Sequence, residues 1–234
     1  MASTFRNLTN QLLRRLNEVE VDEVAFVDCR GVQALAKDAI KNSIAKINAA
    51  EYEWPFNSAE HTQQLLVGQE EYSWPQYFKV VDWNSFQLQK SESLGVGHTM
   101  LSTISRDTYY AQAKDTDDNA PAGLSAPTSV AQGHGNGYIV TPSPNQAYVI
   151  QYRYFLNHTA LSAGTDATRI PDSFDHILIE GALYQMHMFR NNNEAASISL
   201  QLFQQGIKEM QGILINQYET VTDTRTLRVV RAYF

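Results

Sequence analysis

Apolar residues recur at helical spacing near both ends of the chain. This periodicity predicts helices over residues 3–18 and 31–51, and over residues 171–190 and 194–217. In the last of these the apolar positions are spaced 4, 3, 4, 3 and 4 apart: Ala196, Leu200, Phe203, Ile207, Met210 and Leu214. A seam this narrow favours antiparallel packing against the preceding helix.

The middle of the chain, from about residue 60 to 155, instead contains short strand-like runs. Phe78–Val81 and Ser85–Leu88 predict neighbouring strands. Tyr138–Val140 and Ala147–Phe155 flank a turn with two prolines and predict a hairpin. One face of that hairpin would be largely aromatic, because every second residue is large: Tyr148, Ile150, Tyr152 and Tyr154.

Two further segments complete the prediction for the middle region. Ile104–Ala113 fits either a short helix or a strand, and its apolar spacing does not separate the two. Residues 114–137 are rich in Asp, Gly, Pro and Ser and predict a long loop.

The predicted fold class is α+β, with an antiparallel helical bundle from the N- and C-terminal helices and a β-rich insertion in the middle. The expected domains are a helical domain of residues 1–58 and 168–220, a β-rich insertion of residues 59–167, and a C-terminal docking tail of residues 221–234. With 43% apolar and 18% charged residues, the chain has the composition of a folded protein.

Charge is distributed unevenly along the chain. Residues 51–190 hold seven Lys/Arg against fifteen Asp/Glu, whereas the two ends are nearly balanced. An acidic body is unsuited to gripping nucleic acid, whose phosphates require Lys and Arg opposite them. No apolar run approaches the roughly 18–20 residues of a membrane helix, so we expect no membrane partner.

The C-terminal segment has a different character. Residues 224–234 contain three arginines, no acid and five large apolar residues. We expect this segment either to fold back on its own domain or to bind another chain, because leaving its apolar groups in water costs about 1.5–3 kcal/mol each. The expected partner-binding residues are Arg225, Leu227, Arg228, Val229, Val230, Arg231, Tyr233 and Phe234.

Motifs that carry chemistry are missing or incomplete. The six histidines include no His-Glu-x-x-His pattern, and Cys29 is the single cysteine. The glycines of residues 133–137 lack the flanking strand and helix of a dinucleotide site. Residues 115–126 lack the turn glycine and closing glutamate of a calcium loop. We therefore predict no catalytic residue, no metal site and no cofactor.

Four segments, in order, resemble the head–tail adaptors of tailed phages, including tail tubular A proteins. The quoted stretches are Ala39–Asn48 with Trp54–Asn57, Val67–Gly68 with Tyr72–Pro75 and Phe78–Trp83, Tyr138–Asn145 with Tyr148, and Ile170–Phe174 with Phe189–Arg190. The resemblance implies a non-enzymatic subunit of a ring, twelve-fold in such adaptors, seated under the portal protein. DNA would pass through the ring without specific binding.

The same resemblance implies tail or neck proteins as further partners, and a place in the virion at the head–tail interface after assembly in the host cytoplasm. Two alternatives remain open from the residues alone. One is a virion-associated cell-wall hydrolase, which the acidic middle region motivates. The other is a different neck or tail component, such as a tail terminator.

Overall fold

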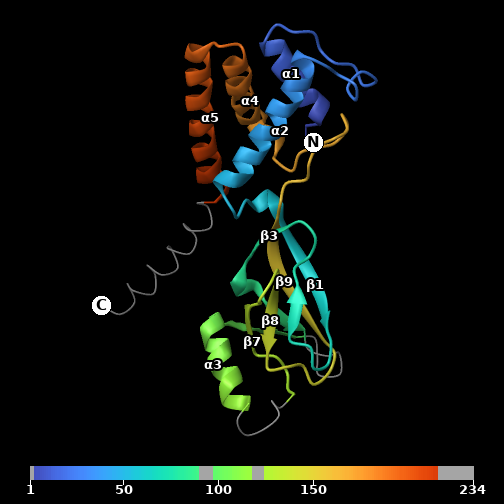
Figure 1. Ribbon diagram of the computed structural model, residues 1–234, viewed down its shortest axis with the longest axis vertical. Coiled ribbons are helices and arrows are strands. Elements are labelled where there is room, and N and C mark those ends of the chain that lie inside the picture. The colour runs from blue at the N-terminus through green and yellow to red at the C-terminus, as the bar shows by residue number, and fades with distance from the viewer. Residues whose placement is uncertain (1–2, 90–96, 118–123, 216–234) are drawn as a thin grey trace, which may run out of the picture. The chain divides into compact units, whose positions relative to one another are not determined.

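The computed structural model describes residues 3–89, 97–117 and 124–215, which divide into two compact units (Figure 1). The helical unit takes the chain up to residue 57 and again from residue 157 onward. The strand unit takes residues 58–156. Each unit buries its own hydrophobic core.

The helical unit contains four of the helices in the described residues. They are α1 (Phe5–Arg15), α2 (Val32–Ala50), α4 (Asp175–Phe189) and α5 (Asn193–Leu214). These confirm the helical segments that the apolar spacing predicts. Polar caps fix two of the starts: Thr4 accepts a hydrogen bond from the N–H of Asn7, and Asn192 accepts one from the N–H of Ala195.

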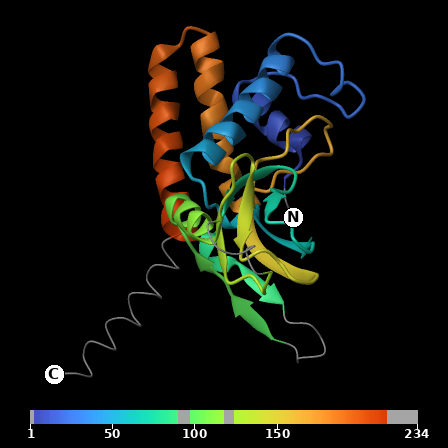
Figure 2. The same cartoon turned by 60° about the horizontal axis from the view of Figure 1, so that its bottom comes forward.

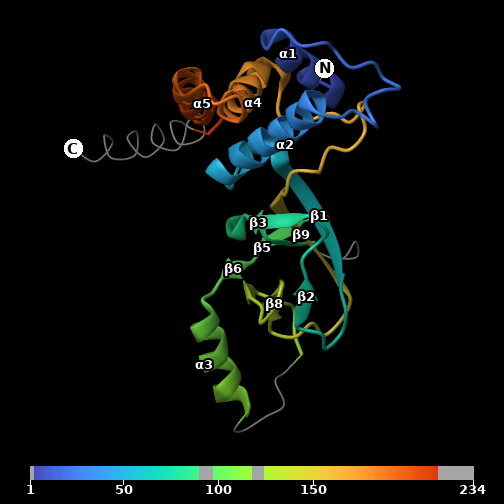
Figure 3. The same ribbon diagram turned by 45° about the horizontal axis from the view of Figure 1, so that its top comes forward.

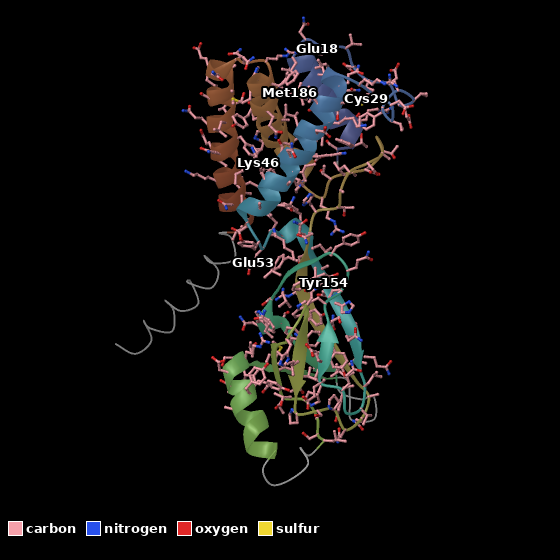
Figure 4. The ribbon with its side chains drawn as sticks, in the orientation of Figure 1. Glu18, Cys29, Lys46, Glu53, Tyr154 and Met186 are labelled. Atoms are coloured by element: carbon pink, nitrogen blue, oxygen red, sulfur yellow. The ribbon has the colours of Figure 1, made fainter. Side chains whose placement is uncertain are left out.

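Helix α4 is the central helix of this unit. It packs against α5 on one side and against α2 and α1 on the other. Its buried residues therefore occupy several faces and not a single stripe: Ile177, Leu178, Ile179, Gly181, Ala182, Leu183 and Met186. Met186, labelled in Figure 4, is almost completely buried.

The predicted fold class is wrong. The described chain is mixed, with five helices and two sheets, and its terminal helices do not form an antiparallel bundle around one insertion. Helix α3 (Arg106–Asp117) lies within the strand unit. Helices α1 and α2 are joined by a long irregular segment, and α2 crosses α4 at an angle while α5 runs beside α4 (Figures 1 and 3). Apolar periodicity identifies a buried face but sets neither the partner nor the crossing angle.

The strand unit contains two sheets. The first has the order β1-β9-β4-β5, with β3 also paired to β9, and all its pairs are antiparallel. Its strands are β1 (Ser58–Leu65), β3 (Phe78–Val81), β4 (Gln87–Gln89), β5 (His98–Met100) and β9 (Tyr148–Leu156). The second has the order β2-β8-β7-β6, from β2 (Glu71–Ser73), β6 (Ser102–Thr103), β7 (Ser129–Gln132) and β8 (Gly137–Thr141).

The predicted hairpin of residues 138–155 does not form. Strands β8 and β9 belong to different sheets, and the chain passes between them through Thr141-Pro142-Ser143-Pro144. Proline has no backbone N–H, so this segment cannot continue a hydrogen-bonded ladder. Likewise β3 and β4 are not neighbours, because each pairs with β9 on its own.

The aromatic face predicted for β9 is confirmed as the centre of the strand unit. Ile150, Tyr152 and Tyr154 are buried, in a cluster shared by residues of both sheets. The rings of Phe86 and Tyr152 stack with centroids 4.7 Å apart, and those of Trp74 and Phe78 stack at 4.4 Å. Such stacking adds about 0.5–1.5 kcal/mol per pair to the burial itself.

The loop predicted for residues 114–137 is partly wrong. The segment Ile104–Ala113, which fits either a helix or a strand, lies largely in helix α3, and this helix continues to Asp117; β7 occupies residues 129–132. The β7–β8 turn explains the glycines of residues 133–137. The N–H of Gly133 donates to the carbonyl of Gly137, and a Cβ on Gly137 would lie 2.2 Å from the Tyr72 carbonyl oxygen.

Candidate assembly surfaces

Close packing through glycines fixes α5 on α4. A Cβ added at Gly181 of α4 would lie 2.6 Å from Cε2 of Phe203 on α5 and 2.7 Å from Oγ of Ser43 on α2. One added at Gly206 of α5 would lie 2.8 Å from Cγ1 of Ile177. Large side chains of each helix thus fill the space opened by a glycine of the other, and α5 is held in one position.

One flank of α5, beside the stripe that packs on α4, carries three exposed apolar side chains, with Glu209 between the second and the third. Ile198, Leu202 and Ile213 keep 55%, 49% and 53% of their surface exposed. At 100° per residue these three positions fall within about 60° of one another, on one side of the buried stripe. Only three of the 22 residues of α5 are charged. Ile198 and Leu202 lie one turn apart and Ile213 about three turns further along, so these exposed groups offer apolar area for contact with another protein.

A second exposed surface is the Val/acid loop, residues 17–30, which joins α1 to α2. Two buried residues anchor it. The backbone of Val21 exchanges two hydrogen bonds with the Asn10 side chain, at 2.9 and 3.1 Å. The Phe26 ring meets Phe5 edge-on at 5.1 Å, and Lys37 donates to the Phe26 carbonyl at 2.8 Å. The loop is thereby held in place although most of its residues face solvent.

The exposed part of this loop alternates valines and acids. Val19, Val24 and Val27 are 78%, 91% and 72% exposed. Three acids are paired with arginines: Glu18 with Arg190, Glu20 with Arg14, and Glu23 with Arg6. Asp22 and Asp28 have no ion-pair partner within residues 3–89, 97–117 and 124–215. Figure 4 labels Glu18 and Cys29, near the two ends of the loop.

Helix α5 and the Val/acid loop lie on opposite sides of the helical unit. In Figures 1, 2 and 3 the blue loop stands at one side and α5 at the other, with α4, α2 and α1 between them. A subunit with unlike surfaces on opposite sides can bind a copy of itself side to side. Such heterologous contacts generate rings when the rotation between copies closes.

The strand unit contains one cluster that combines acid, hydroxyl and phenol groups. Glu70 accepts hydrogen bonds from the Ser143 hydroxyl and, at 2.8 Å, from Tyr109 of α3. Burial, followed by the bond to Glu70, raises the pKa of Tyr109 to about 12. The phenol stays protonated at neutral pH, and its hydrogen bond to Glu70 fastens α3 to the residue before β2.

A polar groove of about 230 Å³ lies on the first sheet, but its charged groups are already paired. Glu60 accepts from Gln151 at 3.0 Å, and Arg153 donates to Asp82 at 3.1 Å. In the described part of the chain no three His, Cys, Asp or Glu residues gather as metal ligands would. Neither feature gives a reactive pair or a coordination shell.

Comparison with protein families decides between the remaining readings. A family model described as SU10 adaptor protein matches residues 3–230, nearly the whole chain. The chain belongs to the SU10 adaptor protein family. No curated protein matches it.

Membership of the SU10 adaptor family confirms the resemblance to phage head–tail adaptors. It makes the protein a structural adaptor associated with the phage particle, in a family that is not a known class of enzyme. Among the described helices of this adaptor none is both long and apolar enough to span a bilayer.

The partner-binding residues expected from sequence, Arg225 to Phe234, lie outside the described residues. The family match nevertheless runs to residue 230 and includes Arg225, Leu227, Arg228, Val229 and Val230. Sequence reasoning did not identify the Val/acid loop or the exposed flank of α5 as surfaces of this adaptor. The alternation of valine with acid over residues 18–24 was the available signal for the loop.

Proposed function

We propose that this SU10 adaptor is one subunit of a closed ring, twelve-fold as in the adaptors it resembles, placed between the portal protein and the tail. The ring would bind the portal, extend its DNA channel and provide the platform for tail or neck proteins. The observation that carries the proposal is the position of helix α5, with its exposed apolar side chains, and of the Val/acid loop on two sides of the helical unit. Unlike surfaces on opposite sides are what a ring of identical copies requires.

The charge of the chain supports a channel through which DNA slides. Each copy carries a formal net charge of −7, so a ring of copies is strongly negative. DNA phosphates find few cations to hold them on such a surface, which favours passage over retention. DNA is accordingly a non-specific passenger in this proposal.

Residues 225–234 remain proposed contacts with the portal or with a neighbouring subunit. Their three arginines and their apolar residues suit an acidic partner surface with exposed apolar groups. Removing these ten residues should leave the fold intact, since both cores lie elsewhere in the chain. The truncated protein should lose portal binding.

Sedimentation of the protein with purified portal tests the proposal. The full-length chain should co-sediment with the portal at a fixed ratio of one ring per portal, and the chain lacking residues 225–234 should not. Circular dichroism of the truncated chain controls for folding. A full-length chain that sediments separately from the portal at every ratio would rule the proposal out.

A further inference from the structure

The segment Asp22–Asp28 of the Val/acid loop exposes apolar and acidic side chains that the described part of the chain leaves uncovered. Its outermost side chains, Val24 and Val27, are 91% and 72% exposed, while Phe26 between them is buried and anchors the backbone. Asp22 and Asp28 stand at its two ends without an ion-pair partner in the part of the chain that is described. Two exposed valines between two unpaired carboxylates form a surface that matches an apolar segment with a cation at each end.

The exposed apolar pair after β1 does not share this pattern. Leu66 and Val67, in the turn after β1, are also more than half exposed. The acids that follow them are occupied: Glu70 accepts from Tyr109, and Glu71 accepts from the backbone N–H of His134 at 3.0 Å. The Val/acid loop thus combines accessible valines with free negative charge.

The complementary segment is present in the same sequence. Arg228-Val229-Val230-Arg231 places two valines between two arginines, with no acid nearby from residue 224 to the end. Guanidinium groups form bidentate contacts with carboxylates, and the valines between them offer apolar area to Val24 and Val27. Both segments thus place two valines between charged ends, acidic in the loop and basic in the tail.

The position of α5 favours the next copy over the same copy as the source of this segment. The chain leaves α5 at Leu214, on the side of the helical unit opposite the Val/acid loop. The loop lies near the start of α5, because Glu18 forms an ion pair with Arg190, just before α5 begins at Asn193. Over its 22 residues α5 spans about 33 Å, so the tail starts far from its own loop. In a ring, that side faces the loop of the next copy.

We propose that Arg228–Arg231 of one copy binds the loop segment Asp22–Asp28 of the neighbouring copy. The arginines pair with Asp22 and Asp28, and the two valine pairs cover one another. The inference rests on the proposed ring, since it requires a second copy at the side of the first. In this proposal the tail holds neighbouring copies together, and the portal is bound by the completed ring.

Disulfide trapping in the full-length chain tests this contact. The variant Val24→Cys/Val229→Cys, with Cys29→Ser to remove the native thiol, is oxidised both free in solution and after addition of portal. A contact between copies gives a ladder of covalent multimers on a non-reducing gel. A contact within one chain gives only a cross-linked monomer, and a tail bound elsewhere gives no cross-link. Either of the last two results would overturn the proposal.

Charge reversal in this trapping variant measures the electrostatic part. Asp22→Arg/Asp28→Arg should lower the cross-linked fraction by about tenfold, and Arg228→Asp/Arg231→Asp should do the same. Combining all four changes should restore most of the ladder. Asp38→Arg, an exposed acid on α2 outside the loop, serves as the matched control and should leave the ladder unchanged. Equal ladders from all variants would contradict the assigned pairs.

The portal assay separates this inference from the proposed function. A ladder without co-sedimentation of portal would retain the contact between copies and reject the adaptor role. Co-sedimentation with portal but no ladder would retain the adaptor role and reject the contact.

Discussion

The glycine at position 181 gives the sharpest stability prediction, because three helices meet there. Replacing it by alanine adds one methyl group between α2, α4 and α5. That carbon would lie 2.6 Å from Cε2 of Phe203 and 2.7 Å from Oγ of Ser43. Ordinary contacts between carbon atoms lie at about 3.5–4.0 Å, so Phe203 must retreat by roughly 1 Å. The Ser43 hydroxyl is almost as close and must also give way.

Two effects of opposite sign determine the size of the change. Overpacking a filled core costs about 1–3 kcal/mol. Exchanging glycine for alanine inside a helix stabilises the helix by up to about 1 kcal/mol. We therefore expect Gly181→Ala to lower the free energy of unfolding by about 1–2 kcal/mol. The matched control is Gly212→Ala on α5, where nothing lies within 4 Å of the added carbon and only the helix gain of up to about 1 kcal/mol applies.

Urea unfolding followed by circular dichroism at 222 nm measures both variants, because the helical unit supplies most of the helical signal. Gly181→Ala should shift the midpoint to lower urea and Gly212→Ala should shift it to higher urea. If both substitutions raised the midpoint, the three-helix contact at Gly181 would be looser than described and the packing account of α4 would fail.

The remaining predictions concern the α5 surface, one pH-sensitive turn and one tight turn. Leu202→Glu should leave the midpoint of unfolding within about 0.5 kcal/mol of the parent yet weaken self-association by sedimentation, whereas Gln204→Glu on the other flank should weaken it less. Asp166 accepts hydrogen bonds from two backbone N–H groups, and these lower the pKa of its carboxyl below the ordinary 3.8. The ionised carboxylate therefore stabilises the fold above pH 3.8, and this stabilisation is lost as the pH falls through the lowered pKa. Asp166→Asn should therefore melt below the parent at pH 6, with a gap that narrows as the pH falls from 4 to 2. Gly137→Ala should destabilise the strand unit by about 2 kcal/mol or more, because the added carbon meets the Tyr72 backbone. Hydrogen exchange in β2 and β8 measures this change. Gly135→Ala, with open space around the added carbon, should leave the exchange unchanged.

Helices α1, α2 and α5 could be predicted from sequence because each has an apolar stripe, and α1 and α5 also begin at a polar cap. Thr4 and Asn192 act as caps, and the seam of α5 follows the spacing of Ala196, Phe203 and Met210. Their arrangement could not be predicted. Gly181 and Gly206 determine how closely α4 and α5 approach, and a glycine carries no periodic signal.

The strand unit shows a second limit of sequence reasoning. Tyr138 and Tyr152 lie close in sequence and in space, with ring centroids 5.4 Å apart, which suggests a hairpin. They belong to facing sheets, because Pro142 and Pro144 interrupt the ladder between them. Strand pairing depends on contacts distant in sequence, such as β1 with β9, which a local pattern does not contain.

The surfaces for assembly were predicted least well. The tail that composition singles out, Arg225 to Phe234, lies outside the described residues. Exposure of Ile198, Leu202 and Ile213 became visible only when the helix was placed on α4, because the sequence shows their apolarity but not which side of α5 is covered. The unpaired state of Asp22 likewise depends on where Arg6 and Arg14 point.

Electron microscopy of the full-length protein mixed with purified portal tests the central claim most directly. The account predicts a closed ring of copies on the narrow end of the portal, with the α5 side of each helical unit against the Val/acid loop side of the next and an open channel along the axis. Single copies scattered on the portal, or a ring whose neighbours meet through neither of these two sides, would contradict it.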